Sequence, residues 1–407
     1  MRILSLLAAA CLAHAQSTLV SLIESAQNNE RIESYRQQTT AASLGYESAR
    51  RSYLPRIDGF ANAAYVDRTG GFDAKQTYTA GVRGEFVVFD GFRRDHLLDQ
   101  NKALENAARH RTDAAKKEVA LGVIQRYFEL QNTLDDIETL AAMRRQIEAQ
   151  LSRLEKFKEA GLASEDALMR MRSELSNARY RIEDLEYHSD RQRAELQTIT
   201  NQTLTDLETA HVVSPEQVQP RESDTLAALR YSRDAKLSEA RQQESSALPT
   251  FKVEDHYTFY DYYNDPIAPM RVDRQNKLIA SLGMNLIDFS AAETTRQLLM
   301  AQAQAQSSDL AYALKESRQE LQVASLYIDR ARAQIEASQS AYDASVQTFE
   351  SVRRKYEARV VDYVTYLDAL HTLADATSRL NRAKRNLHYA YAAYYYYAGL
   401  DPKEFVR

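Results

Sequence analysis

Hydrophobic and polar residues alternate in two regions of the chain, 56–90 and 250–288. Each region contains two alternating segments. They are separated by a polar segment, which has a Gly-Gly pair in the first region and two of the 7 prolines in the second. Tyr78 and Val82 share the apolar face in the first region, and the alternation in the second continues to Leu286. A period of two is typical of a strand with one apolar and one polar face. The pattern therefore predicts a β-hairpin in each region.

The sequence after each hairpin has the period of a long helix. Each hairpin ends in an aspartate, Asp90 or Asp288, and helical sequence then runs from about 92 to 158 and from about 291 to 357. In the second of these segments, a large apolar or aromatic residue recurs at every seventh position from Leu314 onwards. A sustained heptad pattern predicts coiled-coil-like packing. At 1.5 Å per residue, each helix would span roughly 100 Å.

The two halves of the chain repeat the same order of elements. A Leu-Pro pair precedes each hairpin, and Leu248 follows Leu54 by 194 residues. The heptad seam also occurs 198 residues earlier, where Arg144 interrupts it. This repetition indicates an internal duplication of helix, β-hairpin, long helix, turn and helix. The predicted organisation is a signal peptide at 1–15, a first repeat at 16–212 with a tip turn near 161, a linker at 213–224, a second repeat at 225–399 with a tip turn near 359, and a C-terminal tail at 400–407.

The N-terminal residues have the features of a secretory signal peptide. Arg2 precedes an apolar run over 3–12, and Ala13-His14-Ala15 is a small-x-small cleavage site. We expect cleavage after Ala15, which would leave a mature protein without cysteine in an envelope compartment. Two alternatives remain open: a buried first helix, and lipoprotein processing at Cys11, which follows three alanines.

Composition supports a chain with few turns. The 407 residues include 11 glycines and 7 prolines. The combined share of glycine and proline is therefore far below the roughly 12% of an ordinary chain. A hydrophobic content of 44% with 27% charged residues excludes a disordered chain. The net charge of −5 does not indicate the basic surface that a nucleic-acid-binding protein needs. After the N-terminus no apolar run approaches the ~18 residues of a membrane-spanning helix. Phosphate-loop, nucleophile-elbow and His-Glu-x-x-His motifs are absent, so we expect no enzyme, no cofactor and no metal site.

The predicted strands suit a transmembrane β-barrel, because each has about ten residues. Four strands alone would leave two bare edges, and unpaired backbone groups in hydrocarbon cost several kcal/mol each. Two copies would give an eight-stranded barrel filled by side chains, whereas three copies would give twelve strands around a lumen. The polar face favours the wider barrel, so we predict a homotrimer. Its polar residues include Thr79, Arg83, Glu85, Lys252 and Glu254.

The predicted fold class is therefore mainly α with a small β part. Long coiled-coil-like helical hairpins would form a trimeric α-barrel, joined to a 12-stranded transmembrane β-barrel built from four strands per protomer. The alternative is a soluble amphipathic sheet on a helical bundle.

Short motifs in the chain resemble those of the outer-membrane efflux protein family, typified by TolC. LPRIDG (54–59) resembles the Leu-Pro entry into the family's first strand, and VVFDGFRR (87–94) its exit into the long helix. The segments 160–168 and 358–370 resemble its two helix–helix turns, each a Gly-x-x-Ser/Thr motif followed by an acidic residue. The resemblance covers the whole mature chain.

The resemblance implies a protein of the bacterial outer membrane that extends into the periplasm. Such proteins are trimeric exit ducts of drug efflux or type I secretion systems. The implied partners are two further copies, a periplasmic adaptor (membrane fusion) protein, an inner-membrane transporter and outer-membrane lipid, with no nucleic acid. The exported substrate, the adaptor and the pump are not specified by the sequence.

The resemblance also implies a gate at the periplasmic entrance. Asp368 matches one of two ring-forming aspartates of the family, whereas the other position is Thr365. Tyr356 matches a tyrosine that helps to hold the entrance shut. Its acidic partner falls at Ala167, and the nearest acid is Asp166.

A further acid and the tip turns complete the implied site. Asp362 could add to the acidic ring, although Asp362 and Asp368 also suit the first turn of a helix, where the dipole favours acids. Both roles are compatible. The residues implied to dock the adaptor are Gly161, Leu162, Ser164, Arg359 and Val360, with Arg359 where the family usually has Gly.

Two other functions remain as alternatives. A secreted or surface coiled-coil protein with a structural or adhesive role would explain the signal peptide and the heptads, but not two matched hairpins. A pore-forming toxin would share the oligomeric barrel, but would insert from a soluble monomer.

Overall fold

The computed structural model describes residues 18–67, 74–160, 164–204, 207–216, 218–263 and 270–407. The predicted signal peptide, Cys11, Gly161 and Leu162 lie outside the described residues. The described chain is mostly helical and contains one four-stranded antiparallel sheet, which confirms the coarse fold class expected from the sequence.

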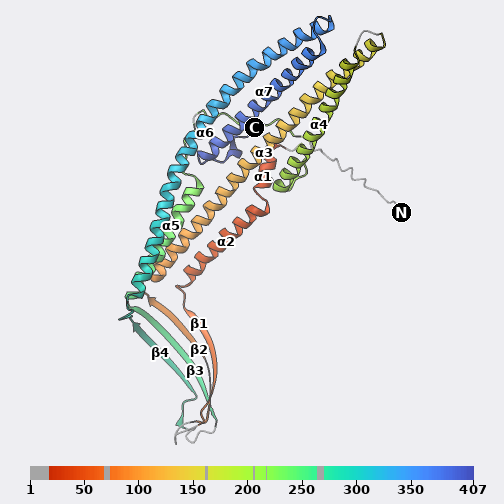
Figure 1. Ribbon diagram of the computed structural model, residues 1–407. Coiled ribbons are helices and arrows are strands. Elements are labelled where there is room, and N and C mark those ends of the chain that lie inside the picture. Colours follow the sequence, from red (N-terminus) through yellow and green to blue (C-terminus); the bar gives the residue numbers. More distant parts are fainter. Residues whose placement is uncertain (1–17, 68–73, 161–163, 205–206, 217, 264–269) are drawn as a thin grey trace, which may run out of the picture. The chain divides into compact units, whose positions relative to one another are not determined.

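The elements follow one another in two similar series (Figure 1). They are α1 (Leu19–Ala26), α2 (Glu30–Arg51), β1 (Arg56–Tyr65), β2 (Gln76–Phe89), α3 (Arg93–Glu159), α4 (Glu165–Thr200), α5 (Asp224–Glu244), η1 (Ser245–Ala247), β3 (Thr250–Tyr263), β4 (Arg274–Gly283), α6 (Ala291–Glu357), α7 (Tyr363–Tyr397) and η3 (Pro402–Phe405).

The chain divides into two compact units. The sheet unit comprises residues 35–112 and 224–314. The helical unit comprises residues 113–223 and 315–407, together with the N-terminal residues up to 34. The long helices α3 and α6 contribute residues to both units.

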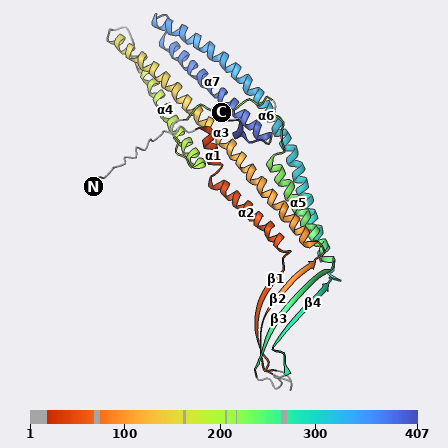
Figure 2. The same cartoon turned by 180° about the vertical axis from the view of Figure 1, so that it is seen from behind.

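In the sheet unit the strands lie side by side in the order β1-β2-β3-β4, and all neighbours are antiparallel (Figures 1 and 2). The prediction that the last strand continues to Leu286 is wrong, because β4 ends at Gly283. Gly283 is paired with Thr250, the first residue of β3. The residue before Thr250 is Pro249, which has no N–H to donate to the ladder, so pairing stops there although the alternation continues.

The apolar face of the sheet is its exposed face. Val82 is 50% exposed, and Leu278 and Leu282 on the edge strand are 77% and 74% exposed. On the opposite face of the same strands, Arg83 and Glu85 are half-buried. A sheet that packed on a water-soluble core would have the reverse arrangement, because apolar side chains gain free energy on leaving water.

The core of the helical unit lies between the ends of two helical hairpins. Apolar residues of α3, α4, α6 and α7 form one cluster, in which Ile147, Met171 and Tyr366 are fully buried. Of the heptad positions predicted for α6, Ile328 and Phe349 are each 6% exposed. The other positions are half-buried in the single chain, namely Leu314, Leu321, Ile335, Tyr342 and Tyr356.

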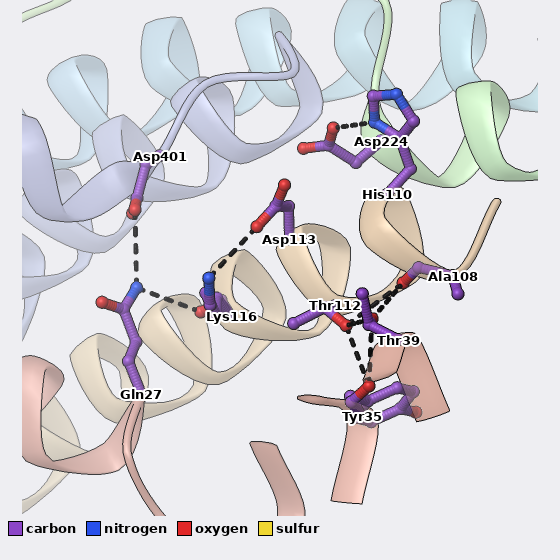
Figure 3. Close-up of polar contacts among 10 residues, drawn as sticks. All are labelled: Gln27, Tyr35, Thr39, Ala108, His110, Thr112, Asp113, Lys116, Asp224 and Asp401. Atoms are coloured by element: carbon purple, nitrogen blue, oxygen red, sulfur yellow. Dashed lines mark hydrogen bonds and ion pairs between the residues drawn. The ribbon is translucent and has the colours of Figure 1, made fainter. Parts of the chain in front are cut away.

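The C-terminal residues join several elements of the helical unit. Gln27, at the C-cap of α1, donates from Nε2 to Asp401 Oδ2 and to the carbonyl oxygen of Lys116, each at 3.4 Å (Figure 3). Arg407 and His211 exchange two backbone hydrogen bonds of 2.8 and 2.9 Å. The end of the chain thereby holds α1, α3 and the segment between α4 and α5 together.

Hydroxyl and imidazole groups join the helices of the sheet unit. Thr112 Oγ1, on α3, lies 2.8 Å from Thr39 Oγ1 and donates to the carbonyl oxygen of Tyr35, both on α2 (Figure 3). His110 Nδ1 lies 2.8 Å from Asp224 Oδ1, at the start of α5. These contacts fix α2 and α5 on either side of α3.

Gly399 ends α7 in a conformation that requires glycine. Its φ is +79°, and the N–H groups of Gly399 and Leu400 donate to the carbonyl oxygens of Tyr396 and Tyr395, as in a Schellman motif. A Cβ atom at this position would lie 2.5 Å from the carbonyl oxygen of Arg221.

We expect the substitution Gly399→Ala to lower the free energy of unfolding by about 2 kcal/mol, because it combines a left-handed backbone with a clash against main chain. Urea unfolding followed by circular dichroism measures the change. Gly122→Ala is the matched control: it lies in α3, its Cβ would meet only the flexible Arg126 side chain, and it should stabilise the protein slightly. Equal effects of the two substitutions would contradict this account of Gly399.

Candidate gate and docking site

The turn between α6 and α7 has a left-handed residue that is not glycine. Arg359 has a φ of +62°. The N–H of Arg359 donates to the carbonyl oxygen of Tyr356 at 3.0 Å, and the N–H of Val360 donates to that of Lys355 at 2.8 Å. This pattern is a Schellman motif, in which glycine is the usual left-handed residue because a Cβ atom is strained there.

A contact of the Arg359 side chain compensates for this backbone strain. Its guanidinium lies over the ring of Phe157, 4.7 Å from the ring centroid. Phe157 belongs to the last turns of α3, so the contact joins the tips of the two hairpins within the helical unit. A cation–π contact of this kind stabilises by about 0.5–2 kcal/mol, similar to the cost of the backbone conformation.

Beside this contact is a cavity of about 250 Å³ between the two tips. Its walls come from all four helices and from both turns. The lining residues are Arg153, Leu154, Phe157, Ser164, Ala167, Tyr356, Glu357, Arg359, Val361, Asp362 and Tyr363.

Tyr356 packs against a second tyrosine rather than an acid. Its ring stacks on that of Tyr366, with centroids 4.9 Å apart and planes 24° apart. Burial raises the pKa of the Tyr356 hydroxyl, and it raises the pKa of Tyr366 to about 12. Both hydroxyls are therefore neutral at physiological pH.

Two of the site residues are N-caps. Ser164 accepts a hydrogen bond from the backbone N–H of Ala167 at the start of α4. Asp362 Oδ1 accepts from the backbone N–H of Thr365 at 2.9 Å and from its hydroxyl at 2.7 Å, at the start of α7. The hydrogen bond from the Thr365 backbone is the main cause of a lowered pKa of Asp362, which therefore stays ionised to a lower pH than a free aspartate.

The other two predicted gate acids lie apart from the cavity. Asp166 and Asp368 are exposed, and neither lines the cavity. Asp166 lies in the first turn of α4, but the expectation that Asp368 lies in the first turn of its helix is wrong, because α7 begins at Tyr363 and Asp368 follows in the second turn. Neither forms an ion pair within the part of the chain that the structure describes. Ala167, the position of the family's acidic partner, is 6% exposed and belongs to the apolar core, where a carboxylate would be costly.

Of the predicted docking residues, Arg359 contacts Phe157, Ser164 caps α4, and Val360 is 72% exposed at the tip. Gly161 and Leu162 lie outside the described residues. The sequence analysis missed Phe157, Tyr366 and Arg153. The one signal in the sequence was Arg359 itself. A residue other than glycine at a left-handed turn position indicates that its side chain makes a contact that compensates for the strain.

No helix in the described ranges is both long enough and apolar enough to cross a membrane. In the same ranges no group of three or more His, Cys, Asp and Glu side chains is arranged to hold a metal ion.

Comparison with protein families confirms the resemblance expected from the motifs. The model of the outer membrane efflux protein family matches residues 22–202. This part of the chain is therefore similar to that family, whose members are transporters of the outer membrane and not enzymes. The match confirms the expected location in the outer membrane. A comparison with curated proteins found no match.

Solved structures of outer-membrane channels share the fold. The CmeC outer membrane channel of Campylobacter jejuni has a TM-score of 0.83 at 14% identity, covering 94% of this chain and 85% of that chain. CusC has a TM-score of 0.82 at 15% identity, covering 95% and 93%. VceC of Vibrio cholerae has a TM-score of 0.81 at 13% identity, covering 94% and 96%.

The balance between strain and contact at Arg359 leads to a prediction. We expect Arg359→Ala to lower the free energy of unfolding by about 1 kcal/mol, because it keeps the strained backbone and loses the contact with Phe157. Arg359→Gly should leave stability close to that of the unchanged protein, because relief of strain offsets the lost contact. Thermal unfolding measures both, and equal destabilisation by the two substitutions would contradict the compensation.

Proposed function

We propose that this protein is the outer-membrane exit duct of a tripartite efflux or type I secretion system. Three copies form a 12-stranded β-barrel continued by an α-helical barrel, and substrates pass through it passively from an inner-membrane pump. The observation that carries this proposal is a sheet with an exposed apolar face and two unpaired edges.

The strand order supports closure by association. β1 and β4 each have one neighbour in the described chain, so one edge of each strand has N–H and C=O groups without a ladder partner. In hydrocarbon such edges are not tolerated, and closing the sheet onto itself in a barrel removes them. Pairing of β4 with β1 of the next protomer continues the antiparallel order, and three protomers give a barrel wide enough for a lumen.

The internal repeat indicates where neighbouring protomers meet. Within the sheet unit, the turn between β2 and α3 packs on Leu248, and a Cβ at Gly91 would lie 2.7 Å from the Leu248 Cβ. The equivalent turn between β4 and α6 carries Phe289, which is 95% exposed. Leu54, the counterpart of Leu248, is 66% exposed. We infer that Phe289 packs against Leu54 of the neighbouring protomer.

The acids of the tips suit a gate in such a trimer. A threefold axis brings three copies of Asp368 and Asp362 around one opening, where like charges repel unless the ring is hydrated or binds a cation. In this proposal Asp368 and Asp362 form the selective ring. Tyr356 holds the second hairpin in place through its stack on Tyr366, and Asp166 adds negative charge on the first hairpin.

The tip turns are the proposed docking surface for a periplasmic adaptor. Val360 offers an exposed apolar contact, and Arg359 and Ser164 fix the two turns around the cavity. Gly161 and Leu162, the other two residues that the resemblance implies for docking, lie outside the described residues. The alternative, a secreted or surface coiled-coil protein with a structural role, gives no reason for the exposed apolar face of the sheet.

The interface proposed at Phe289 is testable by substitution. We expect Phe289→Asp to lower the trimer fraction in detergent by at least about tenfold, because it places a charge in an apolar contact. Phe289→Leu is the matched control and should remain trimeric. Light scattering after size exclusion measures the assembly. A mature protein that stays soluble without detergent as an elongated monomer would contradict the proposed duct.

The proposed gate has its own test in planar bilayers. We expect Asp368→Asn to reduce the preference for cations and to weaken block by divalent cations, because it removes three charges from the ring. Asp375→Asn, on the same helix and paired with Arg379 at 3.9 Å, is the matched control and should change neither. Unchanged selectivity and block in Asp368→Asn would remove this residue from the gate.

A further inference from the structure

The charged residues of the sheet's polar face are confined to one end of the sheet. Pairing register places them in the ladder rows nearest the ends of the strands that join the helices. We call these residues the charged belt: Arg56, Asp58, Arg83, Glu85, Lys252, Glu254, His256 and Lys277.

The register defines the rows of the belt. Glu85 lies opposite Arg56 on one side and Glu254 on the other. In the next row, Arg83 lies opposite Asp58 and His256. Further from the helices the same face carries no charge within the bounds of the strands, and the next described charges lie just before β4, where Asp273 is paired with Tyr260 and Arg271 lies over the ring of Tyr262. The residues of the face within those bounds are Phe60, Asn62, Ala64, Thr77, Thr79, Gly81, Thr258, Tyr260, Tyr262 and Gln275.

Several opposite charges of the belt pair with one another, although Glu85 lies opposite Glu254 and His256 lies opposite Lys277. Asp58 accepts from Arg56 at 2.9 Å and from Arg83, across the strands, at 3.4 Å. Lys252 donates to Glu254 at 2.7 Å. Among the described residues, Glu85 and Lys277 form no ion pair, although both lie within the belt. Four cationic side chains and three carboxylates, with His256 beside them, give a belt that is close to neutral.

We propose that the charged belt is a second charged element of the duct, which interacts with solutes that carry both signs of charge and is separate from the acids of the helical tips. The proposal rests on closure of the sheet into a barrel with its polar face inward. Three copies of the belt then ring the lumen where the barrel meets the helices. A narrow, water-filled section lined by fixed charges concentrates ions of the opposite sign.

The near balance of charge determines what the belt admits. Because four cations and three carboxylates lie within one or two strand spacings of one another, each about 5 Å, the ring has little net field along the lumen. It therefore excludes neither anions nor cations. Each charged group of a zwitterionic solute finds a counter-charge within one or two strands, so the belt suits solutes that carry both signs.

Substitutions at the two unpaired members test the belt without breaking an ion pair. We expect Glu85→Gln to lower the permeability ratio of K⁺ over Cl⁻ by at least about twofold, and Lys277→Gln to raise it by a similar factor. Single-channel recording in planar bilayers measures the ratio. The changes should be large in 0.1 M KCl and shrink in 1 M KCl, because the Debye length falls from about 10 Å to about 3 Å.

Asp255→Asn is the matched control. Asp255 follows Glu254 in β3 and is exposed on the opposite, apolar face, where it is paired with Gly84 and Leu278. Its neutralisation removes the same charge as Glu85→Gln, from the neighbouring strand and outside the proposed lumen, so the permeability ratio should not change.

The outcomes separate this inference from the proposed function. Opposite shifts for Glu85→Gln and Lys277→Gln, with none for Asp255→Asn, support the belt. Conducting channels in which neither belt variant shifts the ratio would overturn the belt and leave the duct standing. An equal shift in Asp255→Asn would also overturn it, since the belt would not be what lines the lumen. Failure of the unchanged protein to form channels would overturn the proposed function itself.

Discussion

Two strand edges without a partner constrain the rest of this molecule. β1 and β4 each direct a row of backbone N–H and C=O groups away from the sheet. In water such edges promote uncontrolled association, and in a membrane each unsatisfied group costs several kcal/mol. A single chain has no element to cover them within its described residues. In the proposed trimer, assembly into a closed barrel would satisfy both edges with the same strands, and for this reason the oligomer would be part of the fold rather than an addition to it.

The polarity of the sheet suits the same proposed closure. A barrel in lipid requires apolar side chains outside and tolerates polar ones inside, which is the arrangement of Val82 and Leu278 against Arg83 and Glu85. Charge on the inner face is concentrated where the strands meet the helices. The long helices have no unpaired edges, because their backbone N–H and C=O groups hydrogen-bond within each helix. Their packing needs only the seam of apolar residues that recurs every seven positions, and the half-buried members of that seam leave surface for neighbouring protomers.

The elements were predictable where a period repeats locally, and the contacts of the site were not. Helix α6, Ala291–Glu357, matches the expected range. Its signals are local in the sequence, because Asp288 stands just before its start and the heptads recur along its length. The predicted end of β4 was wrong, because the alternation of apolar and polar residues continues along the chain beyond the point where the partner strand begins, after Pro249. The contact of Arg359 with Phe157 joins residues about 200 positions apart, and a single sequence has no period that links them. Ala167 was correctly placed at the tip, but its burial depends on packing among helices from both hairpins.

The tip acids Asp362 and Asp368 differ in the hydrogen bonds that their carboxylates accept, and this difference separates a structural role from a functional one. Asp362 accepts two hydrogen bonds from Thr365, so its oxygens are directed towards the start of its own helix. Those bonds lower its pKa and keep its charge constant over the pH range of the periplasm, but they leave it less able to bind a passing cation. Asp368 is exposed and has no such commitment within the described residues. In a trimeric ring, Asp362 would therefore supply a steady background field, and Asp368 would be the group that meets the ion.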